Sequence, residues 1–351
     1  MSLAEFFEAI LKSENGGLRI AVLLILGVIF VNGWTDAPNA ITASVSTGAL
    51  SLRGGVIIAA VFNFIGALVM GALNTSVLRS VGEITMMIEA VGERSLSVLA
   101  AALIAIIVWA IIAWFFGIPT SESHALLSGI FGAALASGAS ITEMNITAIK
   151  LAVLGLFISL PIGFFGGLVI GKLLDIVLYN TKSKRKYDFV KRMQITGASA
   201  MAFMHGAQDS QKFAGVLVAS VLMSGTCKEN IKDSIPIWLT LLCAVVISLG
   251  TSVGGYRIIK KVGMETVSLT GAKGLAADIS GAFSMLLASY FGIPVSTTHT
   301  ATASVIGAGI SYPPRHINMR SVKEMLVAWI LTFPCCGLIS YCSVKIFLLF
   351  T

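Results

Sequence analysis

Long apolar stretches constrain this chain more than any other feature, and they recur at 20–31, 96–116, 151–177, 235–253 and 322–350. About 20 apolar residues in a helix cross the hydrocarbon core of a bilayer. Hydrophobic residues make up 56% of the chain and charged residues 12%, with a mean hydropathy of +0.91, which a soluble domain does not reach. Counting shorter apolar pieces, we predict an all-α integral membrane protein with about 10–12 membrane segments.

The densest basic run lies at 182–192, in the middle of a chain whose net charge is +7. The positive-inside rule predicts that this run is cytoplasmic and touches anionic lipid headgroups, with no nucleic-acid partner. Glu5, Glu8 and Glu14 precede the first apolar stretch where a signal peptide would have basic residues. We therefore expect no removed signal peptide and a multi-pass protein of the cell (inner) membrane.

Two polar motifs occur twice, in the same order. Phe116-Gly-Ile-Pro-Thr-Ser-Glu-Ser-His124 recurs 175 residues later as Phe291-Gly-Ile-Pro-Val-Ser-Thr-Thr-His299, and a motif around Asp36 recurs 173 residues later around Asp209. Internal repeats of this kind are typical of secondary transporters. We predict a first transmembrane repeat at 1–179, a basic linker at 180–192 and a second, inverted repeat at 193–351.

Each Phe-Gly-Ile-Pro sequence ends an apolar run and is followed by hydroxyl residues that favour helix N-caps. This order predicts broken or re-entrant helices whose free N–H groups could hold a tetrahedral oxyanion. Ordinary hydroxyl-lined turns would give the same pattern once, but two copies at one offset favour a binding site. The candidate anion-binding residues are Thr120, Ser121, Ser123, Ser296, Thr297, Thr298, Gln208 and Lys212.

Asp36 and Asp209 follow apolar runs, and an ionisable group inside a bilayer is usually functional. Because carboxylates repel an oxyanion, they fit beside the anion site only if cations bind there, and sodium prefers oxygen ligands. The candidate sodium ligands are Asp36, Asn39, Asp209, Thr35, Gln208, Asp278 and Glu122.

Four residues keep two or more interpretations each. Lys212 pairs with Asp209 or contacts the anion directly, and Glu122 is protonated, sodium-bound or exposed to water. His124 and His299 either cap or orient the proposed anion site, or they are neutral histidines that pack in the interior and bond to backbone carbonyls.

These motifs resemble those of the inorganic phosphate transporter (PiT, solute carrier 20) family over nearly the whole chain. Gly33-Trp-Thr-Asp36-Ala-Pro-Asn39-Ala40 is similar to the family's Gly-Ala-Asn-Asp-Val-Ala-Asn-Ala motif, and 205–212 is similar to its second copy. Thr35, Pro38 and Gln208 depart from the family pattern. The resemblance implies an inverted-repeat transporter, a homodimer, that moves phosphate with sodium or protons and has no cofactor.

The sequence thus predicts a sodium-coupled phosphate symporter rather than an enzyme. An intramembrane hydrolase using Ser121 with His124, or Ser296 with His299, is disfavoured because a nucleophile and base need be built only once. A proton-coupled phosphate or sulfate permease remains open, as does a cation channel or metal exchanger built on Asp36 and Asp209.

Overall fold

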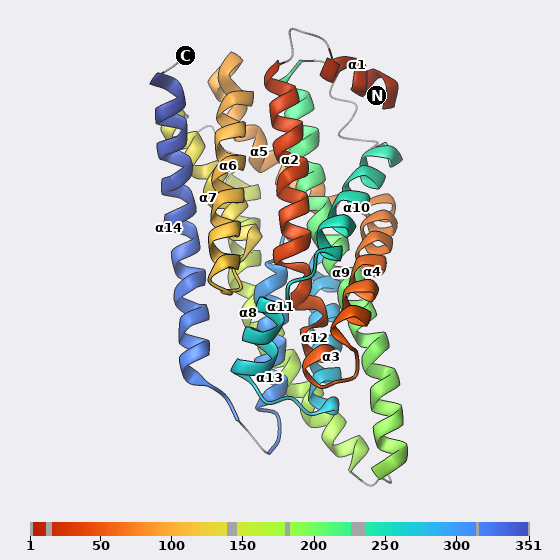
Figure 1. The fold of residues 1–351 in the computed structure, drawn as a ribbon. Coiled ribbons are helices and arrows are strands. Elements are labelled where there is room, and N and C mark those ends of the chain that lie inside the picture. Colours follow the sequence, from red (N-terminus) through yellow and green to blue (C-terminus); the bar gives the residue numbers. More distant parts are fainter. Residues whose placement is uncertain are drawn as a thin grey trace.

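The computed structural model describes residues 3–11, 16–138, 146–179, 183–225, 236–313 and 316–349, which are mostly helical (Figure 1). The α-helices are α1 (Leu3–Leu11), α2 (Gly16–Thr35), α3 (Thr42–Ser46), α4 (Leu52–Leu73), α5 (Ser76–Thr85), α6 (Ser95–Phe115), α7 (Glu122–Ser137), α8 (Ile146–Leu178), α9 (Ser183–Met223), α10 (Ile237–Ser252), α11 (Tyr256–Ile259), α12 (Gly271–Tyr290), α13 (Thr297–Gly309) and α14 (Met319–Leu349). Two 3₁₀ helices (Ala37–Ile41, Met86–Arg94) and a π-helical segment (Lys260–Thr266) complete the described helices. The predicted all-α class is confirmed.

Five helical segments in the described ranges are long and apolar enough to cross a membrane: Gly16–Ser46, Leu52–Leu73, Ser95–Phe115, Ile149–Leu178 and Met319–Leu349. A sixth is possible where Ile237–Ser252 and Tyr256–Thr266 pass the test as a pair bent by 68°. Length and hydropathy therefore identify fewer spans than the 10–12 expected. The difference arises because other helices are short, as α7 and α13 are, or carry many polar residues, as α9 does.

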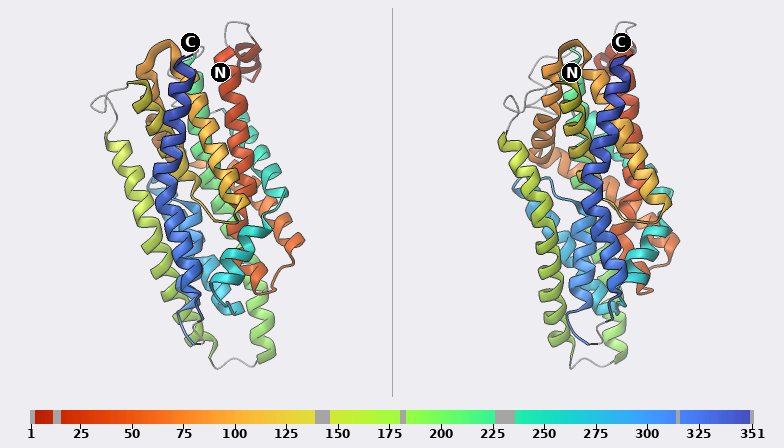
Figure 2. Two further views of the ribbon diagram at one scale, coloured as in Figure 1. Left: turned by 60° about the vertical axis from the view of Figure 1, so that its left-hand side comes forward. Right: turned by 90° about the vertical axis from the view of Figure 1, so that its left-hand side faces the viewer.

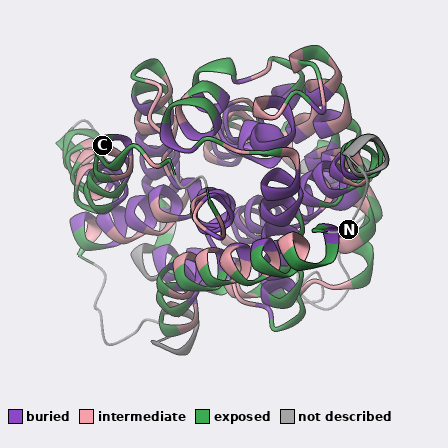
Figure 3. Ribbon diagram, turned by 90° about the horizontal axis from the view of Figure 1, so that it is seen from below, coloured by how far each residue is buried: buried purple, intermediate pink, exposed green. Residues whose placement is uncertain are grey.

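The outer surface of the helix bundle is apolar. Large hydrophobic side chains such as Leu23, Phe157 and Ile330 are at least 70% exposed. Figure 3 shows the complementary pattern, in which buried residues lie on the inward faces of the helices. Such a surface is stable in lipid, where exposed apolar side chains carry no penalty. Many polar side chains are instead buried inside the bundle, including Asp36, Asp209 and Lys212.

Helices with matching motifs run in opposite directions. Both termini lie at one end of the molecule, where α2 begins and α14 ends (Figure 1). Helices α8 and α9 meet at the opposite end, so α9 runs against α2 (Figure 2). Residues 183–192 of the predicted basic linker form the first turns of α9, whereas 180–182 lie outside the described residues.

Helices of the two halves are interleaved, so that a helix of one half packs against a helix of the other half. Helix α7 of the first half packs against α14 of the second, and α13 of the second half packs against α8 of the first. The long helices α8 and α14 each contain a proline, Pro161 and Pro334, at positions 173 residues apart. This exchange of partners places the starts of α7 and α13 in the interior of the bundle.

Glycines allow the closest helix crossings. A Cβ at Gly33 of α2 would lie 2.3 Å from the Ile247 carbonyl oxygen of α10, and a Cβ at Gly206 of α9 would lie 2.2 Å from the Asn63 carbonyl oxygen of α4. Small residues at such contacts are typical of membrane helix packing. Each of these glycines stands three residues before an aspartate of the repeated motif, so the crossings fix the positions of Asp36 and Asp209.

We expect Gly206→Ala to destabilise the protein, because the new methyl group meets backbone atoms that cannot rotate away. Overpacking of this kind costs roughly 1–3 kcal/mol. The measurement is the thermal unfolding temperature of the purified protein in detergent. Gly27→Ala is the matched control, since the nearest atom to its Cβ is the Ile107 side-chain methyl at 3.4 Å. Equal stability of the two variants would contradict the proposed role of the crossing.

Candidate functional site

Two short turns with the same geometry begin α7 and α13. The chain reverses at Gly117 and Gly292, whose φ angles are 67° and 68°. Ser121 then caps α7 by accepting a hydrogen bond from the His124 backbone N–H, and Ser296 caps α13 through the His299 N–H, both at 3.2 Å. The predicted helix breaks and N-caps are confirmed. We call residues 119–124 and 294–299 the two hydroxyl turns.

The two hydroxyl turns contact each other reciprocally. The Ser123 hydroxyl donates to the Val295 carbonyl oxygen (3.2 Å), and the Thr298 hydroxyl donates to the Thr120 carbonyl oxygen (3.0 Å). The two donor residues, Ser123 and Thr298, are 175 residues apart in the chain, and so are the two acceptor residues, Thr120 and Val295. The two bonds are therefore equivalent under the sequence repeat. The starts of α7 and α13 therefore face a shared interior region.

Asp36 lies where α2 ends and a 3₁₀ helix (Ala37–Ile41) begins, so the α-helical pattern ends here although the helical segment continues to Ser46. Its side chain is 2% exposed. It accepts a hydrogen bond from the Asn39 amide (2.7 Å), and the hydroxyls of Thr297 (3.0 Å) and Thr298 lie within hydrogen-bond distance of it. All three donors are neutral, and no cationic side chain among the described residues pairs with Asp36.

Asp209 lies in the middle of the unbroken helix α9 and is 1% exposed. One carboxylate oxygen accepts from the Lys212 ammonium at 2.7 Å. The other accepts from the Asn32 amide at 3.1 Å and lies 3.3 Å from Nε2 of His205. Unlike Asp36, this carboxylate has a cationic partner.

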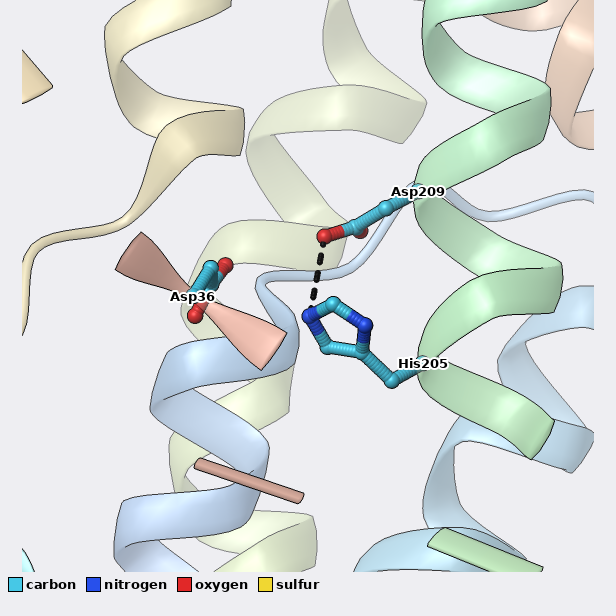
Figure 4. A group of neighbouring side chains, drawn as sticks. All are labelled: Asp36, His205 and Asp209. Atoms are coloured by element: carbon cyan, nitrogen blue, oxygen red, sulfur yellow. Dashed lines mark ion pairs between the residues drawn. The ribbon is translucent and has the colours of Figure 1, made fainter. Parts of the chain in front are cut away.

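The carboxylates of Asp36 and Asp209 lie close together (Figure 4). One oxygen of each and a ring nitrogen of His205 all lie within 4.8 Å of one another. The Thr297 hydroxyl is within hydrogen-bond distance of both aspartates, although it has only one proton to donate. Two buried carboxylates this close repel each other strongly unless a cation or a proton lies between them.

The orientation of His205 follows from its partners. Thr251 donates to the Ile247 carbonyl oxygen, the Asn63 amide donates to Thr251, and Asn63 Oδ1 therefore faces Nδ1 of His205 at 3.2 Å. Nδ1 then carries the proton that it donates. The Nε2 atom, which faces the carboxylates, either carries a second proton or offers its lone pair to a bound cation.

Glu122, at the first position of α7, accepts a hydrogen bond from the Thr35 hydroxyl at 3.0 Å and is 3% exposed. Its second oxygen, Oε2, is buried without a donor, as are the side-chain oxygens of Asn32 and Asn39. Buried acceptors usually have a partner, and hard cations are bound by oxygens of this kind. The donor set around Asp36 therefore fits a cation.

Two predicted ligands lie apart from this cluster. The Gln208 amide donates to the Ser289 hydroxyl of α12 at 2.9 Å, while its oxygen is buried without a donor. Asp278 accepts from the Ser44 hydroxyl of α3 at 2.9 Å and is not part of the Asp36–His205–Asp209 group. Lys212 donates to Ser123, to Asp209 and to the Val295 carbonyl oxygen, so the ion pair is the role that its contacts show.

The two histidines of the hydroxyl turns stack on each other. Their ring centroids are 4.6 Å apart, and the His299 ring lies 4.2 Å from the ring of Trp329. Both ring nitrogens of His299 lack a hydrogen-bond partner, so this imidazole does not activate Ser296. The serines cap helices instead, which argues against the hydrolase arrangement.

Sequence reasoning assigned no role to Asn32 and His205, yet both contact Asp209. They precede Asp36 and Asp209 by four residues each and are therefore equivalent under the 173-residue offset. That shared offset is the signal that could have identified them. Their contact with one aspartate could not be read from the sequence, since it depends on how α2 packs against α9.

Comparison with known proteins extends these findings. The chain matches the model of the phosphate transporter family twice, over residues 32–190 and 179–340. It is 32% identical over 315 residues to a protein of Bacillus subtilis described as a probable low-affinity inorganic phosphate transporter, covering 90% of this chain and 92% of that protein. A Rhizobium meliloti protein with the same description is 33% identical over 329 residues, covering 92% and 96%.

A solved structure described as "The sodium-dependent phosphate transporter" has a similar fold, with a TM-score of 0.73 and 23% identity, covering 95% of this chain and all of that chain. At this identity the likeness concerns the fold. The family matches, in contrast, span both repeated motifs and nearly the whole chain. This protein is a member of the phosphate transporter family.

Proposed function

We propose that this protein carries inorganic phosphate into the cell together with sodium, as a secondary transporter that works by alternating access. The observation that carries the proposal is the meeting of two buried carboxylates, Asp36 and Asp209, with the starts of two helices, α7 and α13. A tetrahedral anion and cations can bind side by side in such a place. The structural neighbour is described as sodium-dependent, which supports the same cation.

Phosphate would bind between the hydroxyl turns. Free backbone N–H groups at the starts of α7 and α13, together with the nearby hydroxyls, favour an anion. The residues proposed for this role are Thr120, Ser121, Ser123, Ser296, Thr297 and Thr298, while Gln208, whose amide donates to Ser289, would have to turn toward the site to take part. Several of these hydroxyls bond to carbonyl oxygens or carboxylates, so binding of phosphate would require them to change partners.

Sodium would bind on the carboxylate side of the site. Asp36, Asn39, Asp209, Thr35 and Glu122 supply buried oxygens around one small region. Asp278, which has the Ser44 hydroxyl as a neutral partner, is proposed as an additional cation or proton site. Positive charge on the bound cations would offset the repulsion between these carboxylates and phosphate.

The opposite directions of α2 and α9 support two inverted repeats, at 1–179 and 193–351. Alternating access would then follow from rocking of one repeat against the other around the shared site. The basic residues at 183–192 favour a cytoplasmic location for that end of the molecule in the cell membrane. We propose a homodimer on the basis of the family resemblance.

Asp36→Asn and Asp209→Asn are each expected to lower sodium-driven phosphate uptake by on the order of 100-fold or more. Asp209→Asn breaks the buried pair with Lys212, and Asp36→Asn removes the charge that would pair with the proposed sodium ion; loss of one partner of a buried ion pair costs about 3–5 kcal/mol. The measurement is uptake of radiolabelled phosphate into proteoliposomes under an inward sodium gradient. Potassium replaces sodium in a control, and arms with a pH gradient or competing sulfate test the proton-coupled and sulfate alternatives.

Asp188→Asn is the matched control, since Asp188 is an exposed carboxylate of the same helix α9 and should leave uptake unchanged. Full uptake by Asp36→Asn would exclude the proposed coupling role of that carboxylate. Sodium flux without any phosphate uptake by the wild-type protein would favour the channel alternative.

Ser123→Ala and Thr298→Val are expected to raise the KM for phosphate about 5- to 10-fold, since each removes one hydroxyl worth roughly 1 kcal/mol. Ser137→Ala, at the far end of α7, removes a hydroxyl that bonds only within its own helix and should leave the KM unchanged. The phosphate dependence of initial uptake rates measures all three. An equal rise in KM for Ser137→Ala would show that loss of helix stability, and not loss of a contact with phosphate at the hydroxyl turns, causes the change.

A further inference from the structure

The residues at positions 39 and 212 are equivalent in the two halves but differ in charge. Their separation of 173 residues equals that of Asp36 and Asp209. Each side chain donates to Oδ1 of its own aspartate, three residues earlier, at 2.7 Å. Asn39 makes this contact with a neutral amide, whereas Lys212 makes it with an ammonium group.

The two aspartates therefore have different charge balances. Asp209 forms an ion pair with Lys212, and both side chains are 2% exposed. Asp36 receives hydrogen bonds only from neutral groups in the described part of the chain: Asn39, Thr297 and Thr298. An unpaired buried carboxylate is unfavourable, so Asp36 needs an added cation or a proton that Asp209, paired with Lys212, does not need. His205 lies near both carboxylates, but the contact of its Nε2 atom, at 3.3 Å, is with Asp209.

The surroundings of the Lys212 ammonium resemble those of a bound cation. Its Nζ contacts three oxygens, at Asp209 (2.7 Å), the Ser123 hydroxyl (2.8 Å) and the Val295 carbonyl (2.7 Å). These come from α9 and from both hydroxyl turns. The contacts use all three N–H donors of an ammonium group. The nitrogen thus lies within a ring of carboxylate, hydroxyl and carbonyl oxygens, which are the ligands that sodium also prefers.

The first half shows the opposite arrangement. The Asn39 amide nitrogen is committed to Asp36, which leaves its Oδ1 atom buried without a donor. Glu122 Oε2 lacks a donor as well. The first half therefore presents oxygens that lack a positive partner, whereas the equivalent place in the second half already contains one.

We propose that the Lys212 ammonium is a built-in cation that takes the place of a co-transported sodium ion in the second half. This inference rests on the proposed function and refines it. The protein would carry one sodium ion fewer per phosphate than the same carrier with a neutral amide at position 212. Coupling would then depend on the site around Asp36, and the repeat would be symmetric in its fold but not in its bound ions.

The test is the ratio of sodium to phosphate transported, measured with both radiolabels in proteoliposomes. Lys212→Asn recreates in the second half the pair that Asn39 forms with Asp36, so its ratio should rise by one sodium per phosphate. Lys212→Arg keeps the charge and should keep the wild-type ratio, even if its rate falls. Asn39→Lys places an ammonium beside Asp36 and should lower the ratio by one. The ratio of sodium to phosphate transported does not depend on how much folded protein each variant yields, so the variants can be compared directly.

An unchanged ratio in an active Lys212→Asn variant would overturn the proposal, as would an equal change in Lys212→Arg. If Lys212→Asn does not transport, equilibrium binding of radiolabelled sodium to the purified protein decides, and one additional sodium per chain is expected. The number of sodium ions bound to the purified protein also tests the role of Lys212 independently of the proposed transport function. Absence of phosphate uptake by the wild-type protein would reject the transport function, while the number of sodium ions bound would still test the lysine.

Discussion

Two buried carboxylates approach each other closely in the interior of the helix bundle. Asp36 and Asp209 come from opposite halves of the chain and lie within reach of one hydroxyl, that of Thr297. In a low-dielectric interior their repulsion is large, so the surrounding groups must compensate for it. Hydroxyls, amides and one ammonium do so in part. In the proposed function, a cation would offset the remaining negative charge and would in turn allow an anion to bind beside it.

Helix packing holds these carboxylates in place. Gly33 and Gly206 lie one turn before the aspartates and allow α2 and α9 to touch the backbones of α10 and α4. The exchange of partners between α7, α8, α13 and α14 brings the two hydroxyl turns against each other. The reciprocal bonds of Ser123 and Thr298 then join the two halves directly.

The duplicated architecture also shows where the halves have diverged. Glu122 stands where the second half has Thr297, and Lys212 stands where the first half has Asn39. Both differences change charge at the centre of the molecule, while the helix breaks and caps around them remain alike. A repeat can thus keep its backbone symmetry and still bind different ions on its two sides, since ion binding depends on a few side chains and the fold depends on many.

Hydropathy, proline and capping act locally, so the all-α membrane class, the two helix breaks and their serine caps could be predicted from the sequence, which also singled out both aspartates as candidate ligands. The sequence did not determine the membrane segments, since α9 and α13 carry polar residues that hydropathy cannot distinguish from loops. Only the tertiary structure decided that Asn32 and His205 contact Asp209, that Gln208 points to Ser289, and that Asp278 lies apart from the central cluster. These contacts join residues far apart in the chain, and long-range helix packing, which leaves no local pattern in the sequence, creates them.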